Sequence, residues 1–204
     1  PGRFQEAFEK QAAAGADTVL CINLASGLSA TMESAQQAAK NVDVDVRVID
    51  TQTVSGAIGL SCIEAAQAAE AGKSADEIVA DLTEKAERTH IFGALNTLEN
   101  LKKGGRIGGA QALVGNMLAI KPILQIAHGH VEEASKQRTR KKAIGWLRDR
   151  ALADDVEDLI VLNGFAADFD EFVDMLAPKY DRKDLFIGTI GPVIGTHAGP
   201  GVIG

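Results

Sequence analysis

The segment 17-DTVLCINLASGLSATMESAQQAAK-40 decides the fold class, because an apolar run is followed at once by a helical pattern. Residues 17–25 are apolar with β-branched members, which is typical of a strand buried on both faces. Residues 26–40 then predict a turn that opens a helix. The alternating residues 44–51 predict a second strand, and the Ala-rich residues 55–72 predict a second helix. This order of strand, helix, strand and helix predicts a parallel sheet covered by helices.

The pattern changes after about residue 88, where short strands and glycine-rich turns replace the regular alternation. Residues 90–96 predict a strand, and two helices are predicted to flank residues 104–109. Residues 120–139 predict a bent strand pair with its turn at His128 and Gly129. A helix, a strand and another helix are predicted over residues 141–180, and the remaining residues predict a strand and glycine-rich turns.

We therefore predict an α/β protein of two α/β lobes. Residues 1–87 form the remainder of an N-terminal lobe, with a parallel Rossmann-like sheet and helices on both faces. Residues 88–204 form a C-terminal lobe, with a mixed sheet and helices. The opening, PGRFQEAFEK, does not begin with methionine, so we expect residues upstream of it.

Composition argues against several functional classes. The net charge of -7 and the sequence pI of about 5.1 do not favour a nucleic-acid binder, which usually has a basic face. Aromatic residues make up 4 %, too few for platforms that stack bases. No apolar run approaches the roughly 20 residues that span a bilayer. Cys21 and Cys62 stand in apolar runs and predict buried free thiols in a reducing compartment, with a disulfide as the alternative, so we expect a cytoplasmic protein.

Known cofactor motifs give no positive signal. Neither a P-loop nor a Gly-x-Gly-x-x-Gly pattern occurs in the sequence. His128 and His130, with Glu132 and Glu133 nearby, offer metal ligands, but a polar solvated turn is the better interpretation. We expect neither a metal nor a cofactor.

Hydroxyl groups after the first predicted strand suit a small anionic group. Ser26, Ser29 and Thr31 follow that strand and open a helix, so they are predicted at the carboxyl edge of the sheet, where α/β proteins bind ligands. The alternative is an ordinary helix cap by Ser26 or Ser29.

An arginine, a histidine and a basic cluster suit the same kind of ligand. Arg106 lies in 104-GGRIGG-109 and His197 lies in 195-GTHAGPG-201, where glycines permit close approach of backbone to a ligand. A solvated turn is the alternative for each. Residues 135–143, SKQRTRKKA, place five cations in an acidic chain and suit phosphate or an acidic partner. Their alternative is a solvated basic stripe at the start of a helix.

Four motifs, taken in order, resemble the DegV family: 25-ASGLSATMESA-35, 98-LENLKKGGRIGGAQALVGNMLAIKPIL-124, 136-KQRTRKKA-143 and 190-IGPVIGTHAGPG-201. The resemblance runs through the whole chain in one register. It implies a soluble two-domain α/β protein that binds a long-chain fatty acid such as palmitate. It further implies that the bound acid is presented to an ATP-using kinase partner, which makes acyl phosphate.

The resemblance assigns roles to four residues. Ser29 falls on the family's serine that contacts the fatty-acid carboxylate, and His197 falls on its histidine close to the carboxylate. Arg106 and Arg138 fall on two arginines implicated in acyl-phosphate production with the kinase.

The chain departs from the family pattern at several positions. Ala30 and Met32 replace the usual glycine and tyrosine of the first motif, and Asn163 stands where a histidine is usual. The family also has an upstream Thr-Ser-Gln-Pro motif, whose threonine binds the carboxylate, before the position of Pro1. The acyl chain needs an apolar tunnel, and six residues are candidates for it, with plain core as the alternative for each: Leu113, Val114, Met117, Leu118, Ile120 and Ile123.

We therefore expect a lipid-binding protein without autonomous catalysis, which is the carrier subunit of a fatty acid kinase. Ser29 and His197 hold the carboxylate, and Arg106 and Arg138 face the kinase subunit. No nucleic acid and no transmembrane segment are expected, and a transient contact with a membrane surface fits the same function. The first alternative is a stand-alone small-molecule acyl or phosphoryl transferase with His197 as base. The second is a regulatory protein whose lipid is structural.

Overall fold

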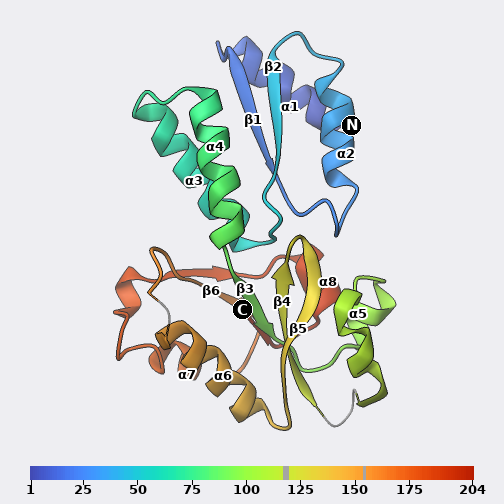
Figure 1. The fold of residues 1–204 in the computed structure, drawn as a ribbon, viewed down its shortest axis with the longest axis vertical. Helices are drawn as coiled ribbons and strands as arrows, with labels where there is room; N and C mark the ends of the chain where they lie inside the picture. Colours follow the sequence, from blue (N-terminus) through green and yellow to red (C-terminus); the bar gives the residue numbers. More distant parts are fainter. Residues whose placement is uncertain (117–119, 154) are drawn as a thin grey trace. The chain divides into compact units, whose positions relative to one another are not determined.

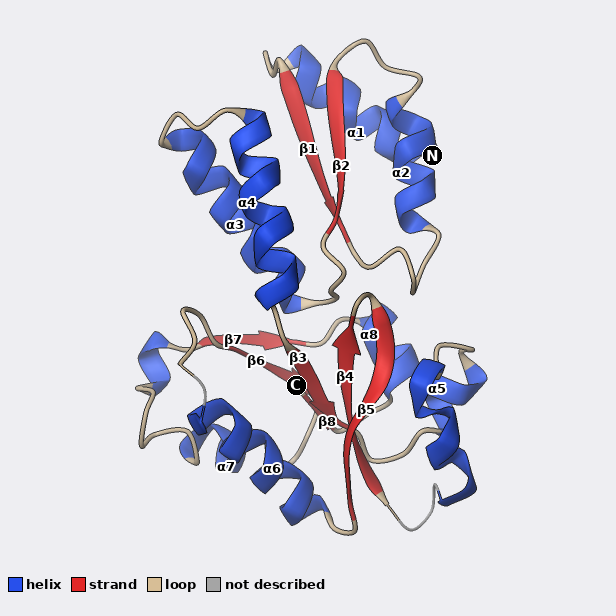
Figure 2. Ribbon diagram, in the orientation of Figure 1, coloured by secondary structure: helices blue, strands red, loops and turns tan. Residues whose placement is uncertain are grey.

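The computed structural model describes residues 1–116, 120–153 and 155–204, which form two compact units. Unit 1 comprises Pro1–Thr89 together with His128–His130, and unit 2 comprises His90–Ala127 and Val131–Gly204. Figure 1 traces the chain through its elements, and Figure 2 separates helices from strands. The predicted α/β class is confirmed, since unit 1 has a parallel strand pair and unit 2 a mixed sheet.

Unit 1 is built around two parallel strands that pair from Thr18 opposite Asp45 to Asn23 opposite Asp50. Its elements are β1 (Thr18–Asn23), β2 (Asp45–Asp50), α1 (Gly2–Ala13), α2 (Thr31–Ala39), α3 (Gly56–Glu70) and α4 (Ala75–Arg88). Helices cover both faces of this pair (Figure 1). That arrangement confirms the prediction for the first lobe.

Successive residues of β1 serve the two faces of the strand pair in turn, as the two-residue period of a strand requires. Val19 and Cys21 pack with Phe8 of α1 and with Ala35 and Ala38 of α2. Leu20 and Ile22 pack with the cluster formed by Ile49, Ala65, Ile78 and Leu82 beneath α3 and α4. The run of apolar residues in β1 is therefore needed because both of its faces are covered.

Local signals fix where these helices begin and end. Ser74 accepts a hydrogen bond from the Glu77 N–H, and the Glu77 carboxylate accepts one from the Ser74 N–H, so a capping box marks the start of α4. Gly72 follows α3 with φ +87°, a conformation that favours glycine.

Both cysteines are free thiols, as predicted. Cys21 is half-buried and Cys62 is exposed, so only Cys21 agrees with the prediction of a thiol packed in the core.

Unit 2 has a mixed sheet with the strand order β5-β4-β3-β8-β6-β7. The strands are β3 (Ile91–Ala94), β4 (Lys121–Ala127), β5 (His130–Gln137), β6 (Ile160–Gly164), β7 (Phe186–Thr189) and β8 (Val202–Ile203). β6 and β7 are parallel, whereas β8 runs antiparallel to both β3 and β6. The predicted turn between β4 and β5 is confirmed, since His128 and Gly129 both have positive φ.

The helical segments of unit 2 are α5 (Glu99–Lys103), the 3₁₀ segment η1 (Gly108–Asn116), α6 (Arg140–Ala153), α7 (Phe169–Asp174), η2 (Arg182–Asp184) and α8 (Pro192–Ala198). The main core lies between the sheet and the pair α6 and α7. Ile144 and Leu147 of α6 meet Phe172 of α7, and Ile123 and Ile203 contribute from the sheet. No described helix is both long enough and apolar enough to cross a membrane.

Two segments of unit 2 differ from the sequence prediction. The helix expected after residues 104–109 is a 3₁₀ segment that already begins at Gly108. Gly108 has φ +49°, and a Cβ there would lie 2.6 Å from the Val131 carbonyl oxygen, so the backbone is packed too closely for a regular α-helix to begin here. The residues around His197, expected as glycine-rich turns, form α8, which has Pro192 in its first turn and ends at Gly199 with φ +81°.

Candidate functional site

The carboxyl ends of β1 and β2 carry a set of buried hydroxyl and amide groups in unit 1. Thr51 and Thr53 are both 3 % exposed. The Thr51 hydroxyl donates to the Asn23 carbonyl oxygen at 2.7 Å, and the Thr53 hydroxyl donates to Thr51 Oγ1 at 2.8 Å. The Asn23 amide donates to Cys21 Sγ at 3.1 Å, while burial raises the pKa of that thiol. This end of the strand pair is therefore polar and internally hydrogen-bonded.

Ser26 is used by the fold rather than left for a ligand. Its hydroxyl donates to Asp50 Oδ2 at 2.6 Å, and the Gln52 N–H donates to Asp50 Oδ1 at 2.8 Å. Asp50 thus ties the residues after β1 to the residues after β2. Neither Ser26 nor Ser29 is the N-cap residue of α2, as the alternative proposed, because Ala30 occupies that position.

Ser29 is half-buried two residues before α2 and keeps its hydroxyl near the helix start. Its Oγ lies 2.8 Å from Thr31 Oγ1, and it accepts a hydrogen bond from the Thr31 N–H at 3.3 Å. Unlike the Ser26 hydroxyl, this pair has no hydrogen bond to a carboxylate among the residues that the structure describes. A hydroxyl in this setting can donate to an anion.

His197 lies in the last turn of α8 in unit 2 and is half-buried. Its Nδ1 atom is buried and has no hydrogen-bond partner among the described residues. The imidazole lies against Gly104, where an added Cβ would overlap Nδ1. Glycine at position 104 is therefore required for the packing of His197.

Arg106 contacts the same glycine. Its side chain is exposed, and one guanidinium nitrogen, Nη1, donates to the Gly104 carbonyl oxygen at 3.1 Å. The Arg106 N–H donates to the Leu101 carbonyl oxygen at 3.2 Å. Gly104 thus brings together two residues that the sequence separates widely, Arg106 and His197.

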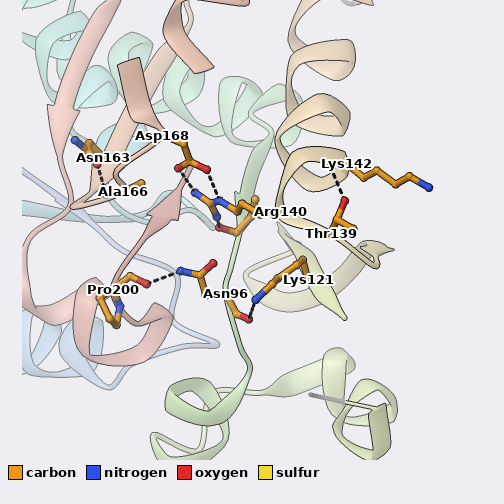
Figure 3. Close-up of polar contacts among 10 residues, drawn as sticks. Asn96, Lys121, Thr139, Arg140, Lys142, Asn163, Ala166, Asp168 and Pro200 are labelled. Atoms are coloured by element: carbon orange, nitrogen blue, oxygen red, sulfur yellow. Dashed lines mark hydrogen bonds and ion pairs between the residues drawn. The ribbon is translucent and has the colours of Figure 1, made fainter. Parts of the chain in front are cut away.

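Two asparagines hold the turn that follows α8. Asn96 donates to the Pro200 carbonyl oxygen at 3.2 Å, and Lys121 donates to the Asn96 carbonyl oxygen at 3.1 Å (Figure 3). Asn100 packs so closely on Gly199 that an added Cβ would overlap its amide. These contacts fix the backbone next to His197. No sequence pattern indicated either asparagine, since each contacts a residue about a hundred positions away.

The basic residues 135–143 do not act as one cluster. Arg140, at the start of α6, binds both carboxylate oxygens of Asp168 at 2.9 and 3.0 Å and donates to the Ala94 carbonyl oxygen at 3.2 Å (Figure 3). These hydrogen bonds hold the pKa of the Asp168 carboxyl below its usual range. Arg138 is exposed between β5 and α6. Arg140 therefore has a structural role that the sequence prediction missed.

The other sequence candidates fall into three groups. Leu113 and Ile123 are buried, with Ile123 in the core beneath α6 and α7, and Ile120 is half-buried. Met117, Leu118 and the side chain of Val114 lie outside the described residues. Asn163 accepts a hydrogen bond from the Ala166 N–H at 2.9 Å and so forms the turn after β6 (Figure 3). The described residues contain no group of three or more metal-binding side chains.

Comparison with known proteins adds evidence along the whole chain. A family model described as "Uncharacterised protein, DegV family" matches residues 1–204. A DegV domain-containing protein of Streptomyces coelicolor is 39 % identical over 210 residues, which cover 100 % of this chain and 74 % of the relative. A fatty-acid-binding DegV family protein from Thermus thermophilus has a TM-score of 0.85 and 33 % identity, with 98 % of this chain and 73 % of that chain covered. A DegV lipid-binding protein from Thermotoga maritima has a TM-score of 0.84 and 34 % identity, and the match covers 98 % of this chain and 72 % of that chain.

Proposed function

Because the chain belongs to the DegV family, we propose that it binds a long-chain fatty acid and holds it by the carboxylate. The observation that carries this proposal is the similarity of almost the whole chain to solved family members, one described as binding a fatty acid and one as binding a lipid. Palmitate is the first ligand to test.

The head group needs hydrogen-bond donors, because a carboxylate taken out of water without them is costly. We assign this role to Ser29 and His197. Within the described part of the chain, the Ser29 hydroxyl has no hydrogen bond to a carboxylate, and the imidazole of His197 has a buried nitrogen without a partner. A hydrogen bond to a charged group contributes about 1.5–3 kcal/mol, so the head group mainly sets orientation.

The acyl tail would supply most of the affinity. Burial contributes about 0.8 kcal/mol for each methylene, so a tail of more than ten carbons outweighs the hydrogen bonds of the head group. Mass spectrometry of the lipid extracted from the protein measures the length of the bound acyl chain directly.

The second part of the proposal is that the protein presents the bound acid to an ATP-dependent kinase partner and does not turn it over alone. Arg106 and Arg138 are exposed, and an arginine can bind phosphate oxygens in a bidentate manner. Arg106 also contacts the glycine that packs on His197, which would bring a phosphate-binding group to the head-group end.

Mass spectrometry of an organic extract from the purified protein tests lipid binding first. A stoichiometric fatty acid is expected, and its mass reports the acyl length. An empty extract, combined with no heat of binding for C14 to C18 acids in calorimetry, would refute the proposal.

The kinase step is tested with an ATP-dependent fatty acid kinase and palmitate. Arg106→Ala should reduce acyl-phosphate formation at least tenfold while palmitate affinity stays within about twofold, since the lost group faces the phosphate. Arg182→Ala is the control, because Arg182 is an exposed arginine paired with Asp170 and Asp174. Acyl-phosphate formation by the isolated protein would instead favour the transferase that uses His197 as base.

A further inference from the structure

The hydroxyl groups of Ser29 and Thr31 form a pair whose hydrogen bonds can be counted. They lie 2.8 Å apart, and either oxygen can be the donor. The Thr31 N–H donates to Ser29 Oγ as well, at 3.3 Å. Both side chains are half-buried, and Thr31 is the first residue of α2. A β-branched side chain on a helix has few rotamers, and threonine has two main ones, so the Thr31 hydroxyl has few positions available to it.

The count leaves one proton for a ligand. Each hydroxyl has one proton and two acceptor sites. The Thr31 N–H occupies one acceptor site of Ser29 Oγ, and a proton from Thr31 Oγ1 would occupy the other. Ser29 can then only donate, and its proton points away from the pair. In the opposite arrangement Ser29 donates to Thr31, and the remaining proton is that of Thr31.

Neighbouring hydroxyls are arranged differently. The Ser26 hydroxyl donates a hydrogen bond to the Asp50 carboxylate, and the Ser34 hydroxyl donates to the Ala30 carbonyl oxygen at 3.2 Å at the start of α2. Neither can turn outward without breaking a hydrogen bond to the protein. The Ser29–Thr31 pair can serve a ligand while its own internal hydrogen bond stays intact.

We propose that Thr31 is a positioning residue for the fatty-acid carboxylate, which orients the Ser29 hydroxyl so that its proton faces the ligand. A carboxylate only accepts hydrogen bonds, so it selects the arrangement in which Thr31 donates to Ser29 and Ser29 donates to the ligand. A hydroxyl that accepts two hydrogen bonds is also a stronger donor, because hydrogen bonds in a chain polarise one another. This inference rests on the proposed fatty-acid binding.

Calorimetric titration of the delipidated protein with palmitate tests the pair. Thr31→Val keeps the size and branching of the side chain but removes its hydroxyl, and should weaken binding roughly tenfold, the loss of about one hydrogen bond to a charged group. Thr31→Ser restores the hydroxyl and should bind within about threefold of the wild type. Ser34→Ala is the control and should bind as the wild type does.

Two further measurements separate this role from a merely structural one. The effects of Ser29→Ala and Thr31→Val should not multiply in the double variant, because Thr31 acts on the ligand only through the Ser29 hydroxyl. Thr31→Val should weaken palmitate more than palmitate methyl ester, since a distorted pocket would weaken both ligands alike. If Thr31→Val binds palmitate with wild-type affinity, or if the effects of the two substitutions multiply, the role of Thr31 is overturned while the proposed fatty-acid binding still stands. Failure of the wild type to bind palmitate or other C14 to C18 acids would overturn the proposed function as well.

Discussion

Removing the charge of Asp168 is expected to destabilise unit 2 by a measurable amount. Asp168 accepts two hydrogen bonds from Arg140, whose side chain also donates to the Ala94 carbonyl oxygen at the end of β3. Asp168→Asn leaves a side chain of the same shape that can accept only one of the two hydrogen bonds. The Arg140 guanidinium then lacks a counterion beside the core of α6 and α7.

The size of the effect follows from the burial of the pair. The Arg140 and Asp168 side chains are 21 % and 27 % exposed. A fully exposed pair contributes about 0–1 kcal/mol, and breaking a fully buried pair costs about 3–5 kcal/mol. This pair lies between these limits, and the variant retains one hydrogen bond, so we expect a loss of about 1–2.5 kcal/mol in the free energy of unfolding near pH 7.

The same loss should depend on pH in a defined direction. The pKa of Asp168 is lowered in the folded protein by the hydrogen bonds from Arg140. Its stabilisation is therefore complete above the unfolded pKa, about 3.9, and is lost as the pH falls through the lower folded value. The difference between wild type and Asp168→Asn should be constant from about pH 5 to pH 7 and should shrink below about pH 4.

Urea unfolding followed by circular dichroism from pH 3 to pH 7 measures this difference. Asp170→Asn is the matched control, because Asp170 also pairs with an arginine, Arg182, but its side chain is 79 % exposed. The control should lose less than about 1 kcal/mol. An equal loss in both variants, or a loss at Asp168 that does not change between pH 3 and pH 7, would show that the ion pair does not stabilise the unit.

Two further substitutions test the head-group site. Ser29→Ala should weaken palmitate binding by about 1–3 kcal/mol in calorimetry if this serine donates to a buried carboxylate, and unchanged affinity would remove it from the site. Gly104→Ala should displace His197, because its Cβ would overlap the imidazole, and so weaken binding and reduce thermal stability. Gly145→Ala in α6, where an added Cβ meets no atom within 4 Å, should instead leave binding unchanged and stabilise the protein by up to about 1 kcal/mol.

Local patterns were sufficient to predict most of unit 1. The apolar run in β1 reports burial on two faces, and the capping box at Ser74 marks the start of α4 from four adjacent residues. α8 was missed because it is short and lies within a glycine-rich segment, so its helical pattern is weak. Its local signals are Pro192 in the first turn and Gly199 directly after the last residue.

The partners within the candidate site could not be predicted from sequence pattern, because they meet through the fold. Arg140 and Asp168 are 28 residues apart, and Asn96 reaches a carbonyl 104 residues away. The run of basic residues 135–143 predicted that Arg140 belongs to a basic cluster or stripe. Its partner is Asp168, which the packing of α6 beside α7 brings to it. The Ser29–Thr31 pair is local, but only coordinates show that Ser26 is already engaged with Asp50.

The position of β8 has a consequence for how unit 2 folds. This strand of two residues lies between β3 and β6 in the sheet, so it joins β5-β4-β3 to β6-β7. It pairs Ala94 with Ile203, residues from distant parts of the chain. Pairing of this kind closes a long loop before it gains contacts, which slows folding. We therefore expect the two halves of the sheet to form first, as a hairpin piece and a parallel piece, and the insertion of β8 between them to be a late step.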